Sequence, residues 1–145
     1  MFKEILVATD GSDLASKALS TGLELSEALK ARMIILTVIA PFPMPAYGSL
    51  PTGALIAAYD RATAENTQRI LADAKAAAAR VGVSCETLHL TNADTAQGIL
   101  ETAKAKNCDL IVMASHGRRG VKRLLLGSVA SKVVTLSDLP VLICR

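Results

Sequence analysis

The chain of 145 residues is long enough to form one domain with a buried core that needs no disulfide or metal. Apolar residues make up 51% of it and aromatic residues only 3%, so the core must be built from Ala, Val, Ile and Leu. The formal net charge is only +3 and the basic residues are scattered, which argues against a dedicated nucleic-acid-binding surface.

The three cysteines match neither a disulfide scaffold nor the spacing of zinc ligands. We therefore expect Cys85, Cys108 and Cys144 to be reduced and mostly buried. No apolar run reaches the roughly 18 residues of a membrane helix. At the start of the chain, no basic region followed by an apolar core marks a signal peptide. These features predict a cytoplasmic protein with no membrane segment.

The first third of the chain alternates between strand and helix patterns. Residues 5–9 form a short apolar run of the kind that is buried on both faces of a parallel sheet. Residues 10–13 then interrupt the run and supply a helix N-cap. Apolar residues recur every three or four positions over 14–29, which predicts a helix, and residues 33–39 form a second apolar run.

Four prolines and two glycines predict an irregular loop between about residues 40 and 53. The alanine-rich segment 54–81 predicts a long helix. Its expected inner face comprises Leu55, Tyr59, Ala62, Ile70, Leu71, Ala74 and Ala78. Residues 83–88 then alternate apolar and polar side chains, as in an edge strand.

The last third continues the same alternation. Asp94, with Gln97 three residues later, is typical of a capping box that opens a helix through residue 106. Residues 110–114 predict a fourth strand, 128–137 a short helix, and 140–144 a final strand.

This alternation predicts an α/β fold with an open parallel sheet of five strands and helices on both faces. We expect the strand order 3-2-1-4-5. In that order the connections of strands one and four leave in opposite directions, which opens a crevice beyond their carboxyl ends. Asp10 and the loop at 114–117 should meet there, although about a hundred residues separate them in sequence.

Two glycine-bearing segments predict an anion site at this crevice. Gly117 follows the fourth strand, and Gly127 and Ser128 open the next helix. Glycine permits close approach of the backbone, and the first turn of a helix has N–H groups without internal partners. Both sets of amides could therefore face one phosphate.

These segments resemble the universal stress protein family. Residues 5–12 are similar to its first strand and turn, 113–129 resemble its nucleotide loop, and 139–143 resemble its final strand. The resemblance covers the whole chain, so it implies one universal stress protein domain over residues 1–145 with a Rossmann-like fold. It also implies that the chain binds ATP, or ADP or AMP, with Mg²⁺.

The family resemblance implies roles for individual residues. Thr9 and Asp10 would lie beside the ribose and adenine, Val38 would flank the base, and backbone groups at 114–117 and 127–129 would hold the phosphates. The Ser128 hydroxyl would add a donor, and Asp10 is also the candidate metal ligand. The full candidate set is Ala8, Thr9, Asp10, Val38, Met113, Ala114, His116, Gly117, Arg118, Gly127, Ser128 and Val129.

One position departs from the nucleotide-binding pattern of the family. The pattern has glycine where this chain has Ala114, whereas Gly117, Gly127 and Ser128 match it. With negative φ an alanine adds only a methyl group. With positive φ it would be strained by about 1 kcal/mol.

Simpler interpretations compete at several residues. Ser128 could be an ordinary helix N-cap, and Asp10 could cap the first helix together with Ser12 or Asp13. For His116 we expect loop structure or a phosphate hydrogen bond rather than acid–base catalysis, and for His89 a partly exposed place in the sheet. The basic cluster Arg118, Arg119, Lys122 and Arg123 is either solvated or supports a polyphosphate electrostatically.

The main functional hypothesis is a cytoplasmic adenine-nucleotide-binding regulatory protein of stress response. The alternative is a nucleotide-free homodimeric interaction protein, which Ala114 favours. At most we expect slow ATP hydrolysis, because phosphoryl transfer needs a base that is not evident.

Family members form homodimers through the final strand. We expect the same here through residues 141–144, whose edge would otherwise stay open. Other protein partners are unknown.

Overall fold

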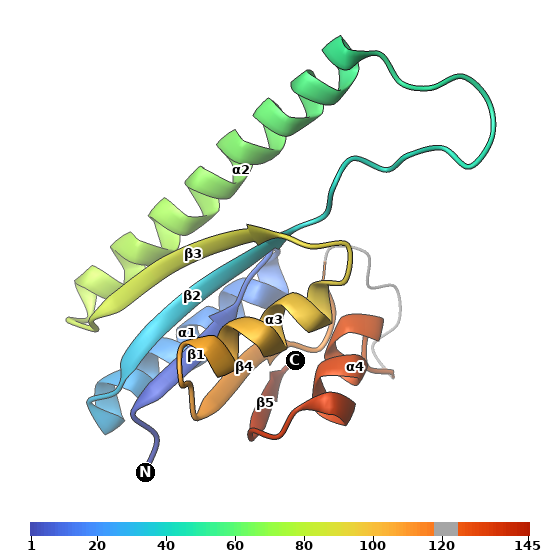
Figure 1. Cartoon of the computed structure of the whole chain (residues 1–145). Coiled ribbons are helices and arrows are strands. Elements are labelled where there is room, and N and C mark those ends of the chain that lie inside the picture. The colour runs from blue at the N-terminus through green and yellow to red at the C-terminus, as the bar shows by residue number, and fades with distance from the viewer. Residues whose placement is uncertain (118–124) are drawn as a thin grey trace.

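The computed structural model describes residues 1–117 and 125–145. Within them, strands and helices alternate along the chain in nine elements (Figure 1). In order they are β1 (Glu4–Ala8), α1 (Asp13–Leu29), β2 (Arg32–Ile39), α2 (Gly53–Arg80), β3 (Cys85–Thr91), α3 (Thr95–Ala105), β4 (Leu110–Ala114), α4 (Ser128–Leu136) and β5 (Val141–Cys144). All nine correspond to elements that the sequence predicts, although β3 ends three residues later than expected.

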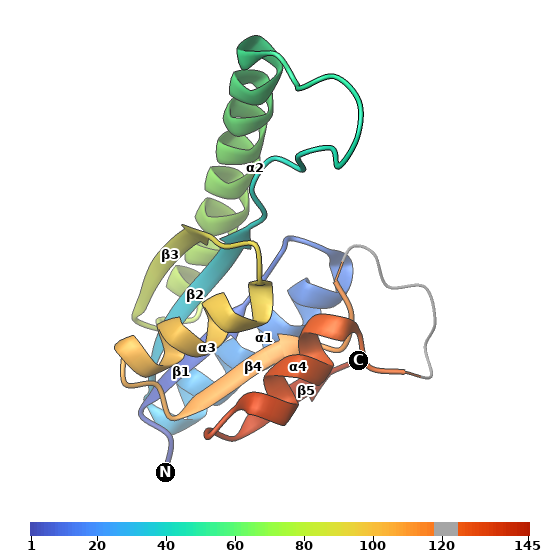
Figure 2. The same cartoon turned by 45° about the vertical axis from the view of Figure 1, so that its right-hand side comes forward.

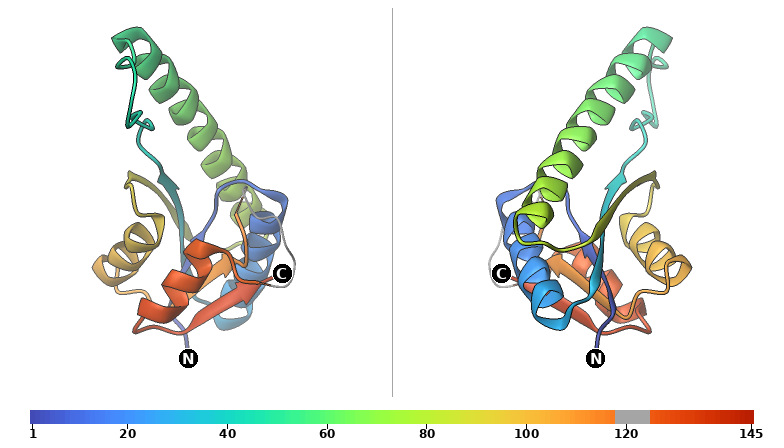
Figure 3. Two further views of the ribbon diagram at one scale, coloured as in Figure 1. Left: turned by 90° about the vertical axis from the view of Figure 1, so that its right-hand side faces the viewer. Right: turned by 90° about the vertical axis from the view of Figure 1, so that its left-hand side faces the viewer.

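The five strands form one parallel sheet in the order β3-β2-β1-β4-β5, which confirms the predicted topology. β1 lies in the middle, with Ile5 opposite Met33 of β2 on one side and Leu110 of β4 on the other. Helices α1 and α2 cover one face of the sheet, and α3 and α4 cover the other (Figures 2 and 3).

Alternate residues of each central strand enter opposite cores. Ile5 and Val7 pack with residues of α1 and α2, whereas Leu6 between them packs with residues of α3 and α4. All three are fully buried. The uninterrupted apolar runs in the sequence therefore reflect strands that are covered on both faces.

Helix α2 extends well beyond the sheet, and this corrects part of its predicted inner face. Its C-terminal half packs on β2 and β3 and buries Leu71, Ala74 and Ala78, but Leu55 near its start is 54% exposed. Ala62 is exposed as well. The N-terminal half lies past the ends of the strands, beside the irregular segment that precedes it (Figure 1). The sheet is too short to cover this part of the helix.

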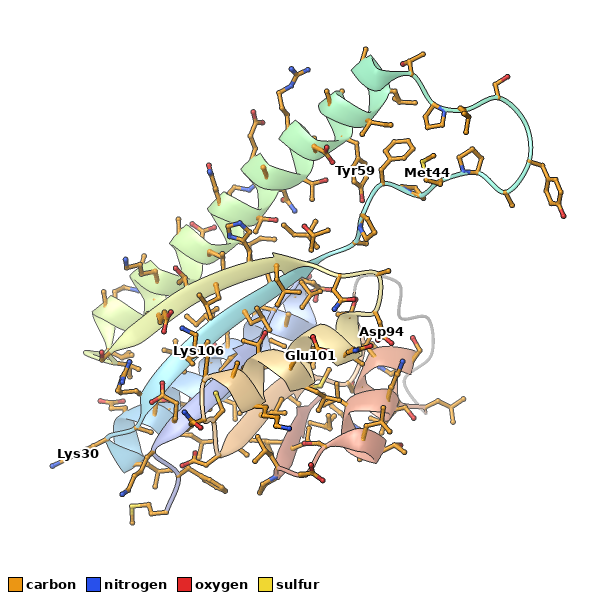
Figure 4. All side chains as sticks on the ribbon, viewed as in Figure 1. Lys30, Met44, Tyr59, Asp94, Glu101 and Lys106 are labelled. Carbon is orange, nitrogen blue, oxygen red and sulfur yellow. The ribbon has the colours of Figure 1, made fainter. Side chains whose placement is uncertain are left out.

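The projecting part of α2 is attached to the preceding segment by one aromatic side chain. The Tyr59 hydroxyl donates to the carbonyl oxygen of Ala40 at 3.0 Å, and its ring meets that of Phe42 edge to face at 5.2 Å (Figure 4). Residues 40–52 contain no helix or strand, as the prolines predict.

The first three helices begin with side-chain caps. Ser12, Thr52 and Asp94 each accept a hydrogen bond from a backbone N–H in the first turn. The predicted capping box at α3 is only half formed, because the Gln97 amide nitrogen donates to Glu101 instead of reaching back. No helix in the described ranges is long and apolar enough to cross a membrane.

The contact between α1 and β1 depends on the absence of a side chain at Gly22. A Cβ added there would lie 2.6 Å from Cγ2 of Val7. We expect Gly22→Ala to lower the free energy of unfolding by about 1–3 kcal/mol because the helix must move off the sheet. Urea unfolding measures this.

Gly53→Ala is the matched control, because nothing lies within 4 Å of the added Cβ. Its effect should stay within about 1 kcal/mol. Equal stability of the two variants would contradict the close packing of α1 on β1.

Candidate functional site

A pocket of about 830 Å³ lies at the carboxyl ends of β1, β2 and β4, where the topology predicts a crevice. This volume is in the usual range for small-molecule sites. Its lining includes most of the predicted nucleotide residues: Ala8, Thr9, Asp10, Val38, Met113, Ala114, His116, Gly117, Gly127, Ser128 and Val129. Arg118, the remaining member of the predicted set, lies outside the described residues.

The turn between β1 and α1 fixes the position of Asp10. Its Oδ1 accepts from the Ser12 N–H at 3.0 Å, and the Thr9 hydroxyl oxygen accepts from the Gly11 N–H at 3.2 Å. Gly11 has a φ of 76°, a conformation that favours glycine. Ser12, not Asp10, is the N-cap of α1.

The other Asp10 oxygen faces the β4–α4 connection. A Cβ added to Gly117 would lie 2.9 Å from Oδ2 of Asp10. A larger residue at position 117 would therefore displace this carboxylate. The two segments meet as the topology predicts.

Gly127 returns the chain to the end of β4. Its N–H donates to the carbonyl oxygen of Ser115 at 2.7 Å. A Cβ on Gly127 would lie 2.9 Å from that oxygen and 3.3 Å from Cα of His116, so a side chain here would force the backbone apart. Glycine at this position thus brings the start of α4 against the carboxyl end of β4.

The N-terminus of α4 differs from those of the other helices. Its N-cap is Gly127, which has no side chain to accept a hydrogen bond, and Ser128 is the first helical residue. The alternative interpretation of Ser128 as the N-cap is therefore wrong. Within the described residues, nothing accepts from the N–H groups of Ser128, Val129 and Ala130. The same three residues line the pocket, so their N–H donors lie at its wall.

The backbone conformation of Ala114 shows whether an alanine is strained at this position. Ala114 is the last residue of β4 and pairs with Cys144 of β5. It is not among the described residues with positive φ. Its side chain belongs to the core cluster that β4 forms with α1. Alanine therefore fits this position without backbone strain.

His116 is half-buried beside the pocket. Its Nδ1 lies 3.1 Å from the hydroxyl oxygen of Ser115, itself a buried residue. This contact orients the ring locally, and the expectation of loop structure or a phosphate hydrogen bond at His116 stays a prediction. The basic cluster of Arg118, Arg119, Lys122 and Arg123 lies outside the described residues.

Sequence reasoning did not identify the contribution of α2 to the pocket. Thr63, Asn66, Thr67 and Ile70 line it, and their spacing places them on one face of the helix. The three polar residues interrupt the otherwise apolar inner face of an alanine-rich helix. That interruption is the signal that could have indicated a pocket.

Titratable groups give little sign of metal or thiol chemistry. In residues 1–117 and 125–145, no three His, Cys, Asp or Glu side chains gather as metal ligands. All three cysteines are free; Cys108 is buried as expected, whereas Cys85 and Cys144 are partly exposed. Burial, with help from Glu4 and Asp109, raises the pKa of the Cys108 thiol to about 11. This thiol is therefore protonated at neutral pH.

A pair of charged side chains ties the N-terminus of α3 to α4. Lys132 donates to Oδ2 of Asp94, while Oδ1 of Asp94 accepts from the backbone N–H of Gln97. The Lys132 hydrogen bond, followed by that from Gln97, lowers the pKa of Asp94. Asp94 and Lys132 line a small hollow with Ser128 and Val129, so the pair holds α4 next to the main pocket.

Comparison with known proteins gives one consistent result. The model of the universal stress protein family matches residues 1–145. Universal stress protein YxiE of Bacillus subtilis is 37% identical over 150 residues, and the match covers 100% of both chains.

Solved structures agree. The universal stress protein UspA from Lactobacillus plantarum superposes with a TM-score of 0.85 at 23% identity, covering 99% of this chain and 97% of that one. A universal stress protein solved in complex with cAMP is 26% identical, with a TM-score of 0.73 and coverage of 99% and 97%.

We expect Lys132→Ala to raise the pKa of Asp94 toward its ordinary value, because the largest cause of its lowering is removed. An NMR titration of the Asp94 carboxyl group measures this, with Lys17→Ala on α1 as the control. A lowered pKa in the folded state stabilises the protein above the ordinary carboxyl pKa, and the effect is lost as pH falls through the folded value. An Asp94 pKa that does not respond to Lys132→Ala would contradict the ion pair.

Proposed function

The chain belongs to the universal stress protein family, and we propose that it is a regulatory protein of stress response that binds ATP, or ADP or AMP, in the cytoplasm. The pocket at the carboxyl ends of β1, β2 and β4 is the proposed site. Binding would couple nucleotide level to the interactions of the protein with its partners.

The observation that carries this proposal is the set of open amides at the start of α4. A helix N-terminus has partial positive charge, and N–H groups without partners favour an anion with several acceptor oxygens. Gly127 holds these amides against the end of β4, at the wall of a pocket large enough for a small molecule. A phosphate chain fits this arrangement better than a neutral ligand does.

The neighbouring part of the pocket suits a nucleoside. Thr9 and Asp10 present oxygen atoms at the end of β1, and Val38 offers an apolar surface at the end of β2. The bound cAMP of the related structure is also an adenine nucleotide. In the proposed mode the base and ribose lie near β1 and β2, and the phosphates point toward α4.

Mg²⁺ is proposed to accompany ATP. This ion keeps several waters and commonly binds through one or two carboxylates together with phosphate oxygens. Asp10 is the proposed protein ligand, because its carboxylate lies beside Gly117 at the phosphate end of the pocket. The phosphates and water would supply the other ligands.

Isothermal titration calorimetry tests the proposal. The protein should bind ATP in the presence of Mg²⁺ with measurable heat, and nucleotide should be released when freshly purified protein is denatured. Absence of heat at millimolar nucleotide would remove the proposal and leave a nucleotide-free interaction protein.

Gly127→Val should weaken ATP binding by at least about 10-fold, because the added side chain meets the Ser115 carbonyl and moves the α4 amides. Gly53→Val is the control, since open space surrounds that position. Ser128→Ala should have a smaller effect, because it removes one hydroxyl and keeps the backbone donors. Equal affinity of Gly127→Val and the wild type would contradict the role of these amides.

We also infer that the protein is a homodimer formed through β5. β5 pairs with β4 on one side, and its four residues are only half-buried in the single chain. The backbone groups on its outer side and the apolar side chains of Val141–Cys144 could pair with the same strand of a second copy.

Light scattering at micromolar concentration should therefore give twice the mass of one chain. The Pro140 and Cys144 carbonyls accept from the β4 side, so the backbone groups of Val141 and Ile143 face the outer edge. Replacing Ile143 by proline, which removes an outward backbone donor from β5, should shift the mass toward that of a monomer. A monomeric wild-type protein would contradict this inference.

A further inference from the structure

A row of polar side chains on α2 forms the wall of the pocket that faces away from α4. Thr63, Asn66, Thr67 and Ile70 line the pocket and follow one another at helical spacing. α2 packs on β2 and β3, whereas α4 contacts α3 and β5. The row and the open amides therefore lie on opposite sides of β1, at two ends of the same cavity.

Thr67 is the most informative member of the row. The residue is only 4% exposed, yet no group in the described part of the chain donates to or accepts from its hydroxyl. Other helical hydroxyls, such as those of Thr102 and Thr135, donate to the carbonyl four residues earlier. Among the described residues, Ser26 Oγ is the buried side-chain oxygen without a partner, so the Thr67 oxygen itself still meets open space although most of its side chain is covered. Thr67 lines the pocket, where its hydroxyl is available to a ligand.

Asn66 adds an oriented amide next to Thr67. Its Oδ1 accepts from Nη2 of Arg69 at 2.7 Å. Among the described residues nothing accepts from its Nδ2, which leaves two N–H donors on a side chain that lines the pocket. The bond from Arg69 engages the Oδ1 end of the amide and leaves the Nδ2 end for a ligand.

The end of the pocket beside α2 is lined by uncharged side chains. The hydroxyl and amide groups share this part of the lining with the apolar side chains of Ile70, Ile39 and Val38. Apolar surface with a few fixed hydrogen-bonding groups suits a flat heterocycle with ring nitrogens better than it suits a phosphate. Asparagine amides recognise adenine through its acceptor and donor edge in other contexts.

We propose that Asn66 and Thr67 contact the base of the bound nucleotide and set the preference of this protein for adenine over guanine. The proposal rests on the nucleotide-binding function stated above and adds the residues that read the base. Asn66 donates from Nδ2 to N1 of adenine, which is an acceptor, whereas N1 of guanine carries a hydrogen and would face the Nδ2 donors. The Thr67 hydroxyl makes a second hydrogen bond to the base edge.

Two variants test the contacts separately. Thr67→Val keeps the shape of the side chain and removes the hydroxyl, so ATP affinity should fall about 2- to 10-fold. The midpoint of thermal unfolding without ligand should stay the same or rise, because the lost hydroxyl has no partner among the described residues of the free protein.

Asn66→Asp keeps an acceptor for Arg69 but replaces the Nδ2 donors by a carboxylate oxygen, which can accept from the N–H groups of guanine.

Titration with ATP, GTP and inorganic tripolyphosphate distinguishes the parts of the ligand. The wild type should prefer ATP to GTP by about 10-fold, and Asn66→Asp should abolish or reverse that preference. Neither variant should change tripolyphosphate affinity, because the α4 amides are untouched. Thr135→Val, which removes an exposed hydroxyl of α4 that bonds within its own helix, is the control and should bind like the wild type.

Four results would overturn the inference. If Thr67→Val and Asn66→Asp bind ATP and GTP as the wild type does, nucleotide binding stays intact but base contacts by these residues are excluded. Equal losses for ATP and tripolyphosphate would place the row at the phosphates. A wild type that binds tripolyphosphate but neither nucleotide would keep the anion site and remove the base subsite, whereas failure to bind any of the three ligands would remove the proposed function as well.

Discussion

The pocket depends on the close approach of Gly127 to the end of β4. The hydrogen bond from its N–H to the Ser115 carbonyl places the start of α4 against the carboxyl end of β4. Since any Cβ at position 127 would meet backbone atoms, this geometry is available to glycine alone without displacement. The same residue is a helix cap without a side chain, and within residues 1–117 and 125–145 nothing accepts from the amides that follow it. One glycine thus sets both the shape and the polarity of the phosphate end.

The backbone, more than any side chain, carries the proposed recognition. Ala114 stands where the nucleotide-binding pattern has glycine, but it is an ordinary strand residue whose methyl group joins the core beside α1. The donors at α4 do not depend on that position. The sequence pattern therefore overstates the importance of glycine at position 114, because the φ there is not positive and the methyl group has a place in the core.

The sequence predicted the fold well because each element carries a strong local signal. Apolar runs identify the buried strands, and helical periodicity identifies α1 and α3. Leu55 was misplaced because periodicity cannot indicate where the sheet beneath a helix ends. Ser128 was a plausible cap because serine and glycine are both favoured there, and only the coordinates show that Gly127 takes the position. Thr63, Asn66 and Thr67 interrupt the apolar face of α2 in the sequence, but only the fold shows that they line the same pocket as the end of β4.

The most direct test of the account is the response of individual backbone amides to nucleotide. In ¹H–¹⁵N correlation spectra of the protein titrated with ATP and Mg²⁺, the amides of Ser128, Val129 and Ala130 should show the largest shifts and slowed exchange with solvent. Their protection should persist when tripolyphosphate replaces ATP. If these three signals stay unchanged while nucleotide binds elsewhere, the α4 N-terminus is not the phosphate site and the central claim is wrong.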